Sequence, residues 1–108
     1  MIIAAIFCDS DGLVIGFKVQ NHGDPIVCAG VSSLVINTVN SIEALTKLTS
    51  AHYIVKCDAQ AGSIGLKLKK SVYRASGAGL LLDALALGLA NSSAQYPSEI
   101  KLSRIYRK

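Results

Sequence analysis

A histidine and a cysteine, His22 and Cys28, are the side chains of this sequence best placed to do chemistry together. Between them lie Asp24, a preferred helix N-cap, and Pro25, which suits the first helical position. Cys28 is therefore expected in or near the first turn of a helix, where the positive end of the helix dipole favours a thiolate over a thiol. A thiolate beside an imidazole base can carry out nucleophilic catalysis at a carbonyl carbon.

Other residues around this pair are candidates for supporting roles. Asp24 would orient the imidazole of His22, because such a pair works better when a third group fixes the base. Free amides at Cys28 and Ala29 would stabilise an oxyanion if the helix begins late enough to leave them unpaired. Ala29 and Gly30 are small and would keep the approach to the sulfur open.

Several further polar residues allow both a functional and a structural interpretation. Ser32 lies one helical turn beyond Cys28 and would either line a substrate groove or bond back to a helix carbonyl. His52 is the alternative base, but nothing in the sequence places it beside Cys28, which favours a structural or surface role. Cys8 and Cys57 are interpreted as core residues.

The first hairpin carries His22 to the end of a strand. Residues 2–8 are apolar at both alternating sets of positions, which predicts a strand covered on both faces and central in a sheet. Residues 9–12 have turn chemistry, with Gly12 able to take a positive φ, and residues 13–19 return as the second strand. His22 follows shortly after.

A long amphipathic helix carries Cys28. From Pro25 to about Thr49, apolar residues recur at helical spacing on one face. Cys28 falls at the edge of that face, half buried and half reachable from solvent. The apolar positions are Val27, Val31, Leu34, Val35, Ile42 and Leu45.

The second half of the chain repeats the order of hairpin and helix. Its expected elements are strands at 53–57 and 64–69 around a turn at 58–62, a helix that begins at Ser76 or Gly77, and a last strand at 100–105. The order ββαββαβ predicts an α+β fold with a mixed, largely antiparallel five-stranded sheet and two helices. The length of 108 residues suits a single domain, 1–108.

The body of the second helix, residues 80–90, is apolar nearly all round, and Asp83 is its one charged residue. Such a helix is unusual on the surface of a small monomer. We therefore expect it to lie partly in a homodimer interface, at Leu85 or Leu89. Asp83 and a run shorter than about 18 residues argue against a membrane span.

The net charge of +4 is uneven along the chain, because residues 56–108 hold nine basic and three acidic side chains. This basic half favours ribosomal or other acidic partners, or it is an ordinary solvated surface. Three cysteines at irregular spacing cannot all pair, and no Cys/His cluster suggests a metal, so we expect no metal, no cofactor and a reducing cytoplasm. The opening apolar run stops at Asp9 and lacks a basic segment, so no secretory signal or membrane anchor is expected.

Two motifs of the chain resemble those of the bacterial ribosomal-processing cysteine proteases. Asn21-His22-Gly23 matches the family's Gly-His-Ala, and Ile26-Val27-Cys28-Ala29-Gly30-Val31-Ser32 matches its Ile-Val-Cys-Ala-x-x-Ser. A looser match continues through Asn37 and Asn40 to Gln95-Tyr96-Pro97. This chain has a shorter loop between histidine and cysteine, and Pro25 replaces the family's aspartate, with Asp24 one place earlier.

The resemblance implies a cysteine endopeptidase that removes a short N-terminal extension from a large-subunit ribosomal protein with a Cys28–His22 dyad. Ser32 would then match the family's serine. Two alternatives remain open: a non-catalytic, ribosome-associated protein or RNA-binding module of the same fold, and a purely structural homodimer. Because the loop between His22 and Cys28 is short, we also expect His22 to be ordered but not hydrogen-bonded to Cys28 in the free protein.

Overall fold

Five strands and two long helices alternate along the chain in the expected order ββαββαβ, and the α+β class is confirmed. The computed structural model describes residues 1–58, 60, 62–73 and 77–107. Its elements are β1 (Ile2–Cys8), β2 (Val14–Gln20), α1 (Pro25–Leu45), β3 (Tyr53–Asp58), β4 (Ser63–Leu68), the short 3₁₀ helix η1 (Lys70–Val72), α2 (Ala78–Gln95) and β5 (Ile100–Tyr106). The expected start of the second helix at Ser76 lies outside the described residues.

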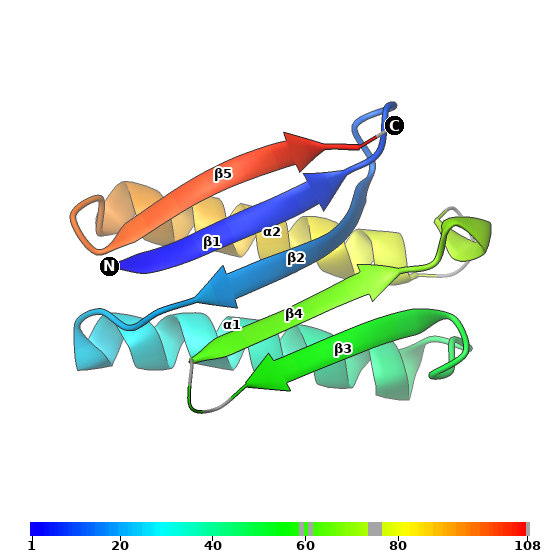
Figure 1. Cartoon of the computed structure of the whole chain (residues 1–108), viewed down its shortest axis with the longest axis horizontal. Helices are drawn as coiled ribbons and strands as arrows, with labels where there is room; N and C mark the ends of the chain where they lie inside the picture. The colour runs from blue at the N-terminus through cyan, green and yellow to red at the C-terminus, as the bar shows by residue number, and fades with distance from the viewer. Residues whose placement is uncertain (59, 61, 74–76, 108) are drawn as a thin grey trace.

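The strands form one mixed sheet in the order β3-β4-β2-β1-β5. The neighbours are antiparallel except for β1 and β5, which run parallel because α2 carries the chain back along the sheet before β5 begins. Both helices lie behind the sheet in Figure 1, side by side on one face. None of the described helices covers the other face (Figure 1).

The hydrophobic core lies between the sheet and the two helices. Alternate residues of β1 point into it and are fully buried: Ile2, Ala4, Ile6 and Cys8. The intervening Ile3, Ala5 and Phe7 are only half buried, so the expectation that this strand is covered on both faces is wrong. Strand β1 is nevertheless internal to the sheet, since it pairs with β2 on one side and β5 on the other.

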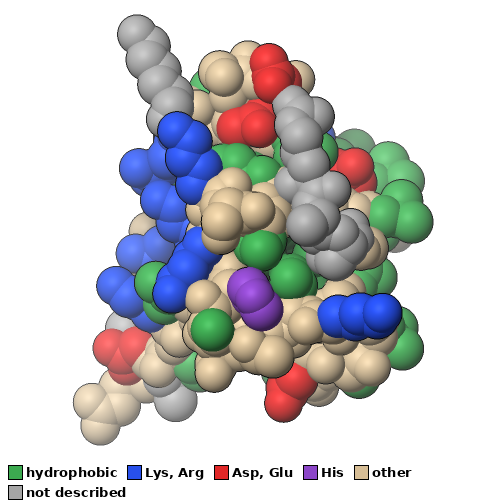
Figure 2. Space-filling view, turned by 90° about the vertical axis from the view of Figure 1, so that its right-hand side faces the viewer, with side chains coloured by type: hydrophobic (Ala, Val, Ile, Leu, Met, Phe, Trp, Pro, Cys, Tyr) green, Lys and Arg blue, Asp and Glu red, His purple; other side chains and the backbone are tan. Residues whose placement is uncertain are grey.

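The uncovered face of the sheet is basic. Strands β2, β3, β4 and β5 each present exposed lysines on it, because alternate residues of a strand point to opposite faces. Figure 2 shows Lys and Arg side chains gathered along the left side of that view, which is the side toward which the uncovered face points. The expected wet face of the 64–69 strand belongs to this surface.

Helix α1 begins as the sequence indicates and ends earlier. The Asp24 carboxylate caps the first turn, and Pro25 is the first helical residue. The end lies at Leu45 and not near Thr49, because the Thr46 hydroxyl donates to the Ile42 carbonyl oxygen at 2.6 Å and so competes with the backbone ladder. By length and composition alone α1 could cross a membrane, but the core helices of soluble proteins pass the same test. Here its buried face packs in the core with the sheet.

The burial of α2 overturns the expected role of two leucines. Leu85 and Leu89 are 2% and 0% exposed, because they pack into the core of this single chain. They are therefore not available for a homodimer interface. The large apolar residues that α2 leaves in solvent are instead Leu80 and Leu87, at 74% and 63% exposure.

This burial predicts opposite outcomes for two neighbouring substitutions in α2. Leu85→Asp places a carboxylate in the core and should lower the free energy of unfolding by about 4 kcal/mol or more. Leu87→Asp, two residues further along the same helix, should change it by only about 0.5 kcal/mol because its side chain is already in water. Urea unfolding monitored by circular dichroism measures both. A small effect at Leu85 would contradict this arrangement of α2.

Candidate active site

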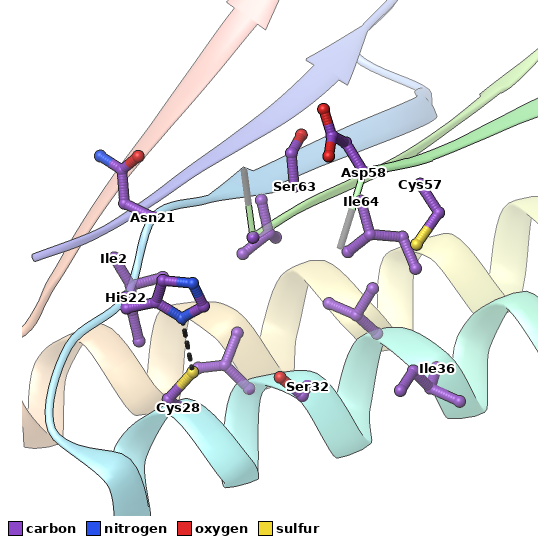
Figure 3. Close-up of a pocket in the computed structure, with 14 residues that line it drawn as sticks. Ile2, Asn21, His22, Cys28, Ser32, Ile36, Cys57, Asp58, Ser63 and Ile64 are labelled. Carbon is purple, nitrogen blue, oxygen red and sulfur yellow. Dashed lines mark hydrogen bonds between the residues drawn. The ribbon is translucent and has the colours of Figure 1, made fainter. Parts of the chain in front are cut away.

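The structure brings His22 and Cys28 into contact. His22 Nδ1 lies 3.9 Å from Cys28 Sγ, a long distance even for a hydrogen bond to sulfur. The imidazole is exposed and the thiol half buried, as the helical spacing predicted for Cys28. Figure 3 shows the ring above the first turns of α1 and pointing at the sulfur. The expectation that His22 is ordered but not hydrogen-bonded to Cys28 in the free protein is therefore not met, because the two atoms lie within reach of a weak hydrogen bond to sulfur.

The N-terminus of α1 sets the position of Cys28. Asp24 Oδ1 accepts hydrogen bonds from the Ile26 and Val27 amides at 2.9 and 3.4 Å. The Cys28 amide donates to the Asp24 carbonyl oxygen at 2.8 Å, which closes the first helical turn. The sulfur is thus held in the first turn, close to the positive end of the helix dipole.

This early start of α1 corrects the expected oxyanion site. The Cys28 amide is already paired, and Ala29, the fifth residue of α1, has its amide inside the helical ladder. Neither amide is free to bind an oxyanion. The hydrogen bonds described for the Asp24 carboxylate also go to the helix, so the orientation of His22 by Asp24 stays a prediction.

The short connection between β2 and α1 is held by two segments at the same end of the sheet, just before the starts of β1 and β5. The N-terminal amino group of Met1 donates to the His22 carbonyl oxygen at 3.0 Å, and the Asp24 amide donates to Glu99 Oε2 at 2.9 Å. Asn21 turns the chain with a φ of 72°, a region that asparagine enters more easily than most residues. These contacts fix the backbone on both sides of the imidazole.

Gly62, at the start of the return strand of the second hairpin, lies against the imidazole. A Cβ added to Gly62 would lie 2.7 Å from His22 Cε1 and would also collide with Nε2. Its φ of +61° is in the left-handed region as well, where a side chain is unfavourable. Gly62 therefore leaves space for the ring on the side away from Cys28.

The thiol and imidazole stand at one end of a cavity of about 330 Å³ between α1 and the β3–β4 hairpin. Its lining surface is mostly apolar, with Val31, Val35 and Ile36 from α1 opposite Ile64 from β4. Figure 3 shows Ser32 one turn and Ile36 two turns beyond Cys28 along the floor. Such a cavity suits an apolar side chain of an extended ligand.

The remaining candidate residues are distributed as follows. Ser32 lines the cavity and is exposed. Ala29 and Gly30 are exposed on α1 but do not line it, and a Cβ on Gly30 would meet nothing within 4 Å. The small size of Gly30 is therefore not needed for space.

The other histidine and cysteines lie in three different environments. His52 does not line the cavity, and its Nδ1 accepts a hydrogen bond from the Thr49 amide at 2.9 Å, which is a structural role. Cys8 is buried in the core as expected. The core assignment of Cys57 is wrong: it is exposed on the edge strand β3, where it lines the far part of the cavity. Among the described residues, no group of three or more His, Cys, Asp or Glu side chains is placed to hold a metal ion.

A thiol and an imidazole in contact at a helix N-terminus are the two groups that cysteine-dependent hydrolases use. The family model described as cysteine protease Prp matches residues 1–101, and the chain belongs to this family. The resemblance noted in the sequence is thereby confirmed. A search of curated proteins finds no match.

Solved structures agree with the family assignment. A ribosomal processing protease Prp from S. aureus with a covalently linked product peptide has 25% identity and a TM-score of 0.85, with 97% of this chain and 100% of that chain covered. The same protease in complex with a substrate peptide has 24% identity and a TM-score of 0.84, at the same coverage of both chains. SMU.848 from Streptococcus mutans has 23% identity and a TM-score of 0.83, with 99% of this chain and 96% of that chain covered. The last two likenesses show the shared fold.

Proposed function

We propose that this chain is an active cysteine endopeptidase that removes a short N-terminal extension from a large-subunit ribosomal protein. Cys28 is the nucleophile and His22 the base. The observation that carries the proposal is the 3.9 Å contact between these two side chains at one end of an apolar cavity, in a chain of the cysteine protease Prp family. The substrate is proposed from the family resemblance noted in the sequence, and the S. aureus ribosomal processing protease, solved with a product peptide and with a substrate peptide, supports a peptide substrate.

The geometry supports a two-step acyl transfer. His22 Nδ1, unprotonated in the tautomer that faces the sulfur, takes the Cys28 proton as the sulfur attacks the peptide carbonyl carbon. His22 then gives this proton to the leaving amine, and a thioester remains on Cys28. Water, deprotonated by the same imidazole, hydrolyses the thioester. The N-terminus of α1 favours the negative charge that develops near the sulfur.

The cavity supports an extended peptide with an apolar side chain beside the cleaved bond. Its walls are formed by α1 on one side and the β3–β4 hairpin on the other, and the aliphatic residues outnumber the polar ones. Ser32, one turn beyond the nucleophile, is placed to contact the peptide backbone. We assign it to substrate binding.

The direct test is cleavage of a precursor. The chain is incubated with the extended form of the large-subunit ribosomal protein from the same genome, and the products are identified by mass spectrometry. The proposal expects a single cut near the N-terminus, after an apolar segment. An intact precursor together with an unreactive Cys28 thiol would favour the non-catalytic alternative instead.

Assembly and compartment complete the proposal. We place the chain in the cytoplasm, where the free thiols of Cys8, Cys28 and Cys57 stay reduced.

We also propose a homodimer that covers the exposed Leu80 and Leu87 of α2. Light scattering of wild type and Leu87→Asp at high micromolar concentration tests it, and a wild-type monomer would contradict it.

Gly62 gives a prediction that depends on the position of the imidazole. Gly62→Ala should lower kcat/KM for peptide cleavage by about 10–100-fold, because the new methyl group pushes the ring of His22 away from its present place. It should also lower the free energy of unfolding by about 1 kcal/mol, since alanine is disfavoured at a φ of +61°. Peptide kinetics and urea unfolding measure the two effects.

Gly12 is the matched control for this substitution. Its φ is +84°, but a Cβ there would meet nothing within 4 Å. Gly12→Ala should therefore show a similar loss of stability with unchanged kcat/KM. Equal loss of activity in both variants would mean that Gly62 acts through stability alone and not through the imidazole.

A further inference from the structure

The uncovered face of the sheet has a regular arrangement that follows from the strand pairing. One row of side chains across the sheet is Ser103, Ala5, Lys18, Gly65 and Lys56, and the next row is Ile105, Phe7, Gly16, Lys67 and Ile54. A third row contains Lys101 and Ile3. Lysines thus stand on four of the five strands, separated by small and apolar residues.

The charge on this face is almost all of one sign. Its exposed cations are Lys18, Lys56, Lys67, Lys101 and Arg107, and Asp58 is the one carboxylate among the described residues of the same face. The difference equals the formal net charge of the whole chain, +4. The described residues of this face therefore carry a concentrated positive charge.

Three of these lysines surround a trough of about 480 Å³. Lys18 and Lys56 flank Gly65 in one row, so their Cα atoms are about 10 Å apart, two strand spacings. Lys67 lies in the next row, on the same strand as Gly65, and so stands between the strands that carry Lys18 and Lys56. Because Gly65 has no side chain, it leaves room between the lysines, and the three flexible ammonium groups can converge over it on neighbouring anionic groups.

An aromatic ring lies at one side of the same trough. Phe7 is half buried on β1, and the Arg107 guanidinium stands 4.8 Å from its ring centroid. Both residues line the trough together with the three lysines. Phenyl rings and guanidinium planes are the groups on which unpaired nucleobases stack.

From this arrangement we propose that the uncovered face of the sheet binds single-stranded RNA. The lysines contact successive phosphates, and a base stacks at the Phe7–Arg107 pair. A combination of a cationic groove and a stacking platform is what sequence-tolerant single-strand binding requires. An anionic membrane would use the charges but not the recessed ring, and no apolar helix projects from this face to enter a bilayer (Figure 1).

Cys28 lies on the other side of the sheet from this face, and the trough and the cavity meet at the edge residues Cys57, Asp58 and Ser63, which line both. Both helices lie on the opposite side of the sheet, and Cys28 belongs to α1. RNA binding therefore does not depend on the proposed cleavage activity, and either can fail alone.

Binding of a fluorescein-labelled 12-nucleotide oligouridylate, followed by anisotropy over a range of KCl concentrations, tests the proposal. Each phosphate neutralised on a single strand contributes about −0.7 to the slope of log K against log salt. Wild type should show a slope of about −2 to −3.5. The triple variant Lys18→Gln, Lys56→Gln, Lys67→Gln should bind at least about ten-fold more weakly at low salt, with a slope about 2 units shallower.

A second triple variant removes the same charge from outside this face. Lys47 lies beyond the end of α1, Lys70 in η1, and Arg104 on the core side of β5, where it donates to Cys8 Sγ at 3.8 Å. Replacing all three by Gln should leave the affinity for the oligonucleotide within about three-fold. Equal weakening in both triple variants would overturn the proposal, because net charge alone would then explain binding.

Phe7→Leu separates RNA from other polyanions. It keeps an apolar side chain at the same place but removes the ring, so affinity for the oligonucleotide should fall about five-fold or more while binding of linear polyphosphate is unchanged. An unchanged affinity for the oligonucleotide would overturn the assignment to RNA. So would tighter binding to phosphatidylglycerol vesicles or to polyglutamate than to the oligonucleotide.

Discussion

Cys28→Ser is expected to reduce cleavage of the ribosomal-protein precursor by about a thousand-fold or more, to the detection limit of a mass-spectrometric assay. Serine keeps the size and the hydrogen-bonding pattern of the side chain, and the helix cap at Asp24 does not depend on the sulfur. What changes is nucleophilicity, since a hydroxyl in place of the thiol is a far weaker nucleophile than a thiolate at neutral pH. Circular dichroism and urea unfolding should match wild type.

Cys8→Ala is the control for loss of a thiol. Cys8 is fully buried in the core and lies outside the cavity, so the substitution should lower the free energy of unfolding by about 1 kcal/mol or more and leave kcat/KM unchanged. Undiminished cleavage by Cys28→Ser would end the assignment of Cys28 as nucleophile. It would leave the proposed RNA-binding face untouched.

The first half of the fold was predictable because its signals are local. Asp9 and Gly12 specify the first turn, where Asp9 Oδ1 accepts from the Asp11 and Leu13 amides at 2.9 Å and Gly12 takes a φ of +84°. Asp24 and Pro25 likewise mark the start of α1, and from it follows the place of Cys28. Such signals involve residues a few positions apart, and they can be read without knowing the rest of the structure.

The surroundings of the imidazole were not predictable because they depend on distant segments. Glu99 reaches the Asp24 amide only because β5 lies parallel to β1, and Gly62 meets the ring only because β4 pairs with β2. Glycine in a turn already has a local explanation, so the sequence gives no sign of a second role at Gly62. The contact of His22 with Cys28 was also missed, because a short loop is compatible with either position of the ring.

Burial was predicted less well than the elements themselves. Cys57 was assigned to the core because free cysteines are commonly buried, but β3 is the edge of the sheet, and the cavity opens beside it. Leu85 and Leu89 were assigned to a dimer interface because α2 is apolar nearly all round, whereas both lie in the core of this chain. Periodicity indicates which residues share a face of an element, but not which layer covers that face.

His22→Ala should reduce cleavage nearly as much as Cys28→Ala does, by about a thousand-fold, because the imidazole is the base in contact with the thiol. His52→Ala is the matched control, since His52 is the only other histidine of the chain and does not line the cavity. It should lower stability through the lost hydrogen bond from the Thr49 amide and leave kcat/KM unchanged. Loss of activity in His52→Ala and not in His22→Ala would reverse the assignment of the base.

The double variant Cys28→Ala, His22→Ala decides whether the two side chains act as one unit. Groups that cooperate in a single proton transfer and attack are strongly non-additive, so the double variant should cleave no more slowly than either single variant. Two independent contributions would multiply instead and give about a million-fold loss from two thousand-fold losses. Residual rates from prolonged incubations with excess protein distinguish these outcomes. An additive result would mean that the 3.9 Å contact in the free protein is not the catalytic arrangement, and that the base lies elsewhere when substrate is bound.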